Sequence, residues 1–113
     1  MTTTDNLLER LVKRVNETGE LLDVTLMVRG ATITGKLAPR GKYLSTIVEE
    51  LHKRGLEGYA EDFAAEGHAL DTEEYLHLSG GQVLFGSKPL PEKGGLARIP
   101  LHAVDGWWLG RVA

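Results

Sequence analysis

The chain has 113 residues, of which 42% are hydrophobic and 26% are charged, a composition typical of one soluble globular domain. It contains no cysteine, which excludes disulfides and thiolate metal sites. No apolar run approaches the roughly 20 residues of a membrane span, and no signal peptide is recognisable. The net charge of −3 disfavours a nucleic-acid partner, because phosphate binding needs a basic surface. We expect a single domain over residues 1–113 with no membrane partner.

The first predicted element is an amphipathic helix over residues 5–18, ended by Gly19. Its apolar residues recur at i, i+1, i+4, i+5 and i+8, which places them on one helical face. These residues are Leu7, Leu8, Leu11, Val12 and Val15. This face must be covered by the rest of the domain.

Residues 21–38 are predicted to form a β-hairpin. Apolar and polar residues alternate from Leu22 to Val28 and again from Ala31 to Leu37, as in strands with one buried face. The dipeptide Arg29-Gly30 supplies the turn, because glycine adopts a positive φ at little cost. Gly35 inside the second strand indicates a bulge or a sharp bend.

A helical insertion is predicted over residues 41–67, with helices over 41–54 and 56–66 separated by Gly55. Residues 49–74 hold nine acidic and two basic residues, a net charge of −7, so the remainder of the chain carries +4. Such a segment is typical of a solvated layer, and it is also a candidate surface for a basic partner. The candidate residues are Glu57, Glu61, Asp62 and Glu66.

The C-terminal region, residues 74–112, is predicted to return to β-structure. Apolar runs separated by glycine and proline indicate short strands with turns between them. The sequence predicts strands over 75–78, 82–85, 96–101 and 107–112, a hairpin turn at Ser79-Gly80-Gly81, a loop over 86–95 and one helical turn over 102–106.

The order of helix, two strands, helical pair and further strands indicates an α+β fold. We favour a small five-stranded antiparallel barrel of the SH3-like or Sm-like type, with the N-terminal helix over one open end and the helical hairpin as an insertion. The alternative is an open antiparallel sheet with the helices packed on one face.

The sequence contains no recognisable catalytic or metal-binding pattern, so we expect neither an enzyme nor a cofactor. No two of the four histidines stand at His-x-x-x-His spacing, and no serine lies in Gly-x-Ser-x-Gly. The remaining enzymatic alternative is a centre assembled from His77, His102 and distant carboxylates.

Trp107 and Trp108 are adjacent on the last predicted strand, so their side chains point to opposite faces. One can fill the core, and the other lies on the outer face, either covered by a helix or open to a partner. We expect the exposed tryptophan, with Leu109 and Arg111, to form part of a contact surface. Exposed strand edges favour a homo-oligomer.

Three blocks form a more specific pattern: Leu21–Gly35, Tyr75–Gly86 and Leu101–Val112, the last containing Val-Asp-Gly, two tryptophans and Leu-Gly. Together they resemble the gas vesicle accessory protein U family (GvpU-like). The resemblance implies a cytoplasmic, vesicle-associated accessory protein without catalytic activity. It would assist vesicle assembly or organisation by contacting shell or other accessory proteins. Some relatives continue into a polar tail, and if that tail clusters vesicles, a chain ending at Ala113 is not expected to do so.

An Sm-like RNA-binding module is the alternative function. It depends on the barrel interpretation and on four basic residues near the first hairpin, which are Arg29, Lys36, Arg40 and Lys42. RNA binding through such a patch should weaken steeply with salt.

Overall fold

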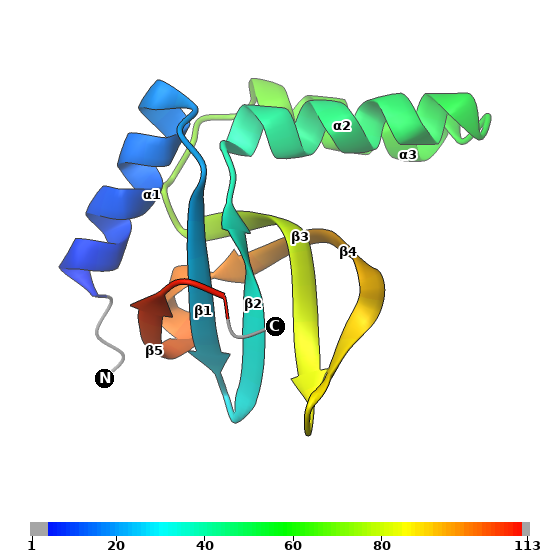
Figure 1. Ribbon diagram of the computed structural model, residues 1–113. Coiled ribbons are helices and arrows are strands. Elements are labelled where there is room, and N and C mark those ends of the chain that lie inside the picture. The colour runs from blue at the N-terminus through cyan, green and yellow to red at the C-terminus, as the bar shows by residue number, and fades with distance from the viewer. Residues whose placement is uncertain (1–4, 112–113) are drawn as a thin grey trace.

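The computed structural model describes residues 5–111 and has an α+β architecture (Figure 1). The helices are α1 (Asn6–Thr18), α2 (Arg40–Lys53) and α3 (Glu57–His68), and the strands are β1 (Leu22–Val28), β2 (Ala31–Leu37), β3 (Tyr75–Phe85), β4 (Lys88–Pro100) and β5 (Val104–Leu109), with a 3₁₀ turn, η1 (Leu101–Ala103), before β5. The strands form one five-stranded antiparallel sheet in the order β4-β3-β2-β1-β5. Within residues 5–111 no pairing joins β4 to β5, so the sheet is open, as in the alternative interpretation, and barrel closure is not observed.

Helix α1 provides the apolar layer that covers the sheet. Its first turn is capped by the Asp5 carboxylate, which accepts hydrogen bonds from the amides of Leu7 and Leu8 at 2.8 and 3.2 Å. Gly19 ends the helix with a φ of +76°. The buried face of α1 joins side chains of β1, β2, β3, β4 and η1 in one core, made of Leu8, Val12, Val15, Val24, Leu26, Leu37, Leu76, Leu78, Ile99 and Leu101.

The opposite face of the first hairpin is also covered, which the alternation of the sequence does not predict. Thr25 and Thr34 are paired across β1 and β2, and both are fully buried. The Thr25 hydroxyl donates a 2.7 Å hydrogen bond to the carbonyl of Gly110. The following residue, Arg111, donates to the carbonyl of Gly80 on β3 at 2.9 Å. The C-terminal segment therefore passes across this face, as Figure 1 shows in front of β1.

The predicted turn at Ser79-Gly80-Gly81 is wrong, because β3 runs without interruption from Tyr75 to Phe85 and the chain turns at Gly86-Ser87. The pairing of β3 with β4 shifts register between Leu78 and Gly81, as at a β-bulge. Most of the segment predicted as the loop 86–95 belongs to β4, which begins at Lys88. These glycines therefore allow β3 to bend and to approach β4 closely, and they do not form a turn.

Helices α2 and α3 form the predicted helical hairpin, and Gly55 between them has a φ of +73°. Tyr43, Leu44 and Ala60 are its buried apolar residues. Figure 1 shows the hairpin lying across one end of the sheet and projecting beyond it. The projecting tip, residues 54–59, is exposed throughout.

Candidate contact surfaces

The two tryptophans of β5 have different environments, as strand alternation predicts. Trp107 is partly buried and packs against the core cluster. Its Nε1–H donates a 2.9 Å hydrogen bond to Oδ2 of Asp5, the residue that caps α1. This bond, together with those from the amides of Leu8 and Leu7, lowers the pKa of the Asp5 carboxyl below its usual value. Trp107 therefore connects β5 to the start of α1.

Trp108 and Leu109 are the exposed apolar residues of β5, with exposed fractions of 42% and 60%. Trp108 lies opposite Thr25 on β1, and the next residue on the same face of β1, Met27, lies opposite Gly106. Because Gly106 has no side chain, Met27 remains 42% exposed beside Trp108. We call Met27, Trp108 and Leu109 the β5 surface; Leu109 points to the other face of the strand from Trp108, so this surface lies on both sides of the sheet edge. Met27 occupies a polar-face position in the alternation of β1, so a large apolar residue there is a sequence signal for a contact surface.

Arg111 does not belong to the β5 surface. Its Nη2 donates hydrogen bonds of 2.9 Å to the Gly80 carbonyl and to Oε1 of Gln82, both on β3. The guanidinium therefore points across the sheet and holds the C-terminal segment in place. Its predicted role as a contact residue receives no support from this geometry.

The four acidic residues predicted to form one stripe on α3 are divided by the structure. Glu57 pairs with the ring of His52, and Oε1 of Glu66 accepts a 2.9 Å hydrogen bond from Nη2 of Arg98 on β4. Glu61 and Asp62 are exposed, and neither has an ion-pair partner between residues 5 and 111. Of the four, Glu66 is thus engaged with the sheet, whereas Glu57, whose ion-pair partner within residues 5–111 is His52, stays exposed together with Glu61 and Asp62.

A charged cluster joins the helical hairpin to the sheet. The guanidinium of Arg40 donates to the backbone carbonyl of Glu66 at 2.6 Å and lies 3.9 Å from the Asp71 carboxylate. The guanidinium of Arg98 lies 4.1 Å from the ring centroid of Tyr75, a cation–π distance. These contacts link the helical hairpin to the sheet, and a pocket of about 230 Å³ beside them is lined by Asp62, Phe63, Glu66 and Arg98.

His77 is buried beside this cluster, 2% exposed, with its ring centroid 4.5 Å from that of Tyr43. Burial, reinforced by the positive charges of Arg98 and Arg40, lowers the pKa of His77 to about 4. The imidazole is therefore neutral at physiological pH. His77 is buried whereas His102 is exposed, and within residues 5–111 no group of three or more His, Asp or Glu side chains is placed to hold a metal ion.

Comparison with known families identifies the chain. The family described as "Gas vesicle protein GvpU-like" matches residues 5–112. The chain belongs to this family. The predicted family resemblance is thereby confirmed, and the match spans the helical insertion as well as the three blocks that carried the prediction. No curated protein and no solved structure matches the chain.

The GvpU-like fold gives no support to the alternative of RNA binding. Nζ of Lys36 lies 3.1 Å from a carboxylate oxygen of Asp23. The Arg40 side chain is only 15% exposed and is paired with Glu66 and Asp71. Two of the four basic residues are therefore already neutralised by neighbouring carboxylates.

None of α1, α2 and α3 has the length and apolar composition that a membrane span requires.

Proposed function

We propose that this GvpU-like protein is a non-enzymatic accessory protein that assists the assembly or organisation of gas vesicles in the cytoplasm. It acts by contacting vesicle shell proteins or other accessory proteins, and it does so as a homo-oligomer. Membership of the family over residues 5–112 is the observation that carries the proposal. The β5 surface is the part of the fold that best suits such contacts.

Two properties of β5 support this role. The strand is at the edge of the sheet, and its outer side has no partner strand among residues 5–111, so its backbone can pair with another chain. Next to this edge stand Trp108 and Leu109, exposed apolar side chains of the type that anchors protein interfaces. A single interface could therefore combine backbone pairing with apolar burial.

The proposal is tested by binding the purified protein to isolated, intact gas vesicles and by measuring its oligomeric state with light scattering. We expect vesicle retention by the wild type and loss of retention for Trp108→Ala combined with Leu109→Ala. Leu70→Ala is the matched control, because Leu70 is an apolar residue that is 89% exposed but lies outside the β5 surface. Retention by the double variant equal to that of the control would assign the contact elsewhere, and failure of the wild type to bind would refute the vesicle contact.

A further inference from the structure

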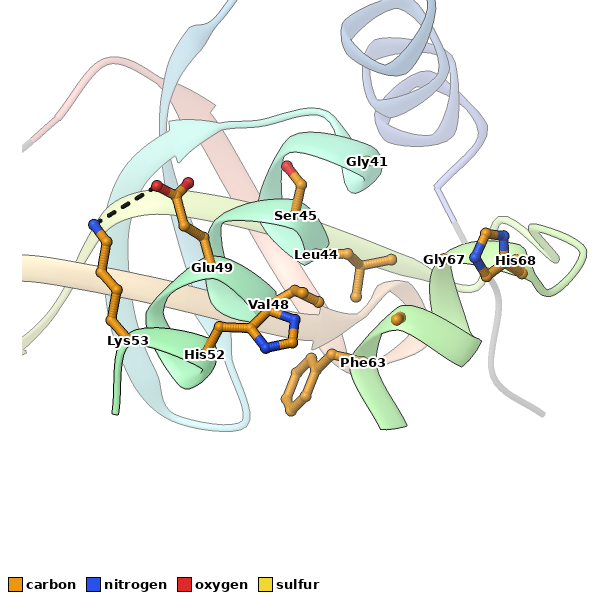
Figure 2. Close-up of a pocket in the computed structure, with 11 residues that line it drawn as sticks. Gly41, Leu44, Ser45, Val48, Glu49, His52, Lys53, Phe63, Gly67 and His68 are labelled. Carbon is orange, nitrogen blue, oxygen red and sulfur yellow. Dashed lines mark ion pairs between the residues drawn. The ribbon is translucent and has the colours of Figure 1, made fainter. Parts of the chain in front are cut away.

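The helical hairpin contains an apolar groove that the function proposed above does not use. It lies between α2 and α3 and has a volume of about 560 Å³. Figure 2 shows Leu44 and Val48 of α2 and Phe63 of α3 around the space between the two helices, with His52 beside Phe63. Two of the α3 residues along the groove, Ala64 and Gly67, have little or no side chain, which leaves space between the helices.

The charges on the rim of this groove are mainly negative. On α3, Glu57 and Glu61 precede the lining residues Ala64 and His68 at i, i+4, i+7 and i+11, so all four share one face of the helix. On α2, Glu49 lines the groove, but its Oε1 lies 3.6 Å from Nζ of Lys53 and is thereby paired.

The α3 rim is the more open to a cation. Glu57 has only the ring of His52 as its partner, and Glu61 has no ion pair in the part of the chain that the structure describes. Residues 49–74 carry a net charge of −7, so the electrostatic potential is also negative around the rim.

We propose that this groove binds an amphipathic α-helix of a partner protein, with the apolar face of that helix in the groove and lysine or arginine residues over α3. The shape suits a helix, because the α2 residues that line the groove extend from Gly41 to Lys53, about 18 Å at 1.5 Å per residue. Large apolar side chains at i, i+3 and i+4 of the partner would fill it, as in other helix-in-groove complexes. The open carboxylates of α3 then favour a partner helix with a basic flank.

The inference is tested with a fluorescein-labelled 18-residue amphipathic peptide that carries leucine on one face and lysine on its flanks. A second peptide has the same leucine face and glutamate on its flanks. Fluorescence anisotropy is measured with the full chain at low and at moderate salt. We expect saturable binding of the lysine peptide and binding of the glutamate peptide at least about tenfold weaker, because its flanks would face the carboxylates of α3.

Two variants locate the binding, and circular dichroism shows whether they fold. Ala64→Gln places a longer polar side chain in the groove, keeps a good helix former, and should weaken binding by tenfold or more. Glu61→Lys should weaken it by about fivefold at low salt and less at higher salt. Glu92→Lys makes the same change of charge at an exposed position of β4 and should leave binding unchanged, as should Trp108→Ala.

Binding that is equal for both peptides, or that is unaffected by Ala64→Gln, would overturn the proposal. So would an absence of peptide binding by a protein that still binds a small apolar dye in the groove, since the groove would then be a small-molecule site. Because the β5 surface is lost in Trp108→Ala and intact in Ala64→Gln, failure here is distinguishable from failure of the vesicle contact.

Discussion

The imidazole of His77 is surrounded by groups from several elements that decide its charge. Tyr43 and Arg40 approach from α2 and Arg98 from β4, while Glu66 and Asp71 contribute the opposing negative charges. Neither ring nitrogen has a hydrogen-bond partner between residues 5 and 111. A protonated ring would therefore be both desolvated and repelled, which favours the neutral form.

This environment predicts a loss of stability in mild acid. The folded-state pKa of about 4 lies below the ordinary value of 6.5, so the unfolded chain takes up the proton first and stability falls as the pH drops from about 6.5 towards 4. The contribution is of the order of 2–3 kcal/mol at pH 4.5. His77→Leu should remove it and should not destabilise the protein at pH 7, whereas His102→Leu at an exposed position should change nothing. Urea unfolding at both pH values measures this, and equal pH dependence in the two variants would exclude His77 as the cause.

The tryptophan pair predicts a second difference between neighbouring residues. Trp107→Ala removes core packing and the hydrogen bond to Asp5, and it should lower the free energy of unfolding by about 2–3 kcal/mol. Trp108→Ala should lower it by less than about 1 kcal/mol, because the side chain is already 42% exposed. Thermal unfolding of both variants checks this, and similar losses would show that Trp108 is a structural residue rather than a contact residue.

At the scale of the elements, local sequence patterns predicted the helices and the first hairpin. The pairing of the later strands and the openness of the sheet depend instead on contacts between residues distant in sequence. The periods of apolar residues in α1, α2, α3, β1 and β2 are properties of short segments. Barrel closure is not such a property, since it depends on whether β4 and β5 meet. Which tryptophan is buried depends likewise on where α1 packs, although alternation alone predicts that the two differ.

The bend of β3 shows why its glycines suggested a turn. Glycine is required equally by a tight turn and by a close approach of two backbones. At Gly94 of β4, which has a φ of +73°, an added Cβ would lie 2.7 Å from Cα of Gly80. The glycines in the sequence indicate that these positions have a special backbone requirement, but the sequence alone does not distinguish a tight turn from a close approach of two strands.

This close approach predicts unequal costs for two similar substitutions. Gly86→Ala, at a φ of +66° with open space around the new methyl group, should cost about 1 kcal/mol of unfolding free energy, the penalty of the left-handed conformation. Gly94→Ala adds the clash with the β3 backbone and should cost at least about 3 kcal/mol. Urea unfolding gives both values. Equal costs would mean that β4 can move away from β3 without loss.

As a whole, the molecule consists of a sheet covered by α1 and an acidic helical hairpin attached near one end of that sheet. The attachment is concentrated at the start of α2 and the end of α3. The amide of Arg40 donates to Oδ1 of Asn16 at 2.8 Å, and Glu66 accepts from Arg98 at 2.9 Å. The tip of the hairpin, residues 54–59, makes no buried contact with the sheet. The hairpin is thus anchored at one end and free at the other.

This arrangement predicts that the hairpin opens locally while the sheet remains folded. In hydrogen exchange, amides of α2 and α3 near the tip should exchange many-fold faster than those of β1 and β2, which exchange only on global unfolding. Glu66→Ala, which breaks the link to Arg98, should accelerate exchange throughout both helices without changing β1 or β2. Glu61→Ala removes an exposed carboxylate from the same helix and should have no such effect. If the hairpin and the sheet exchange at one common rate in all three proteins, they unfold as one unit, and the groove between α2 and α3 is as rigid as the core.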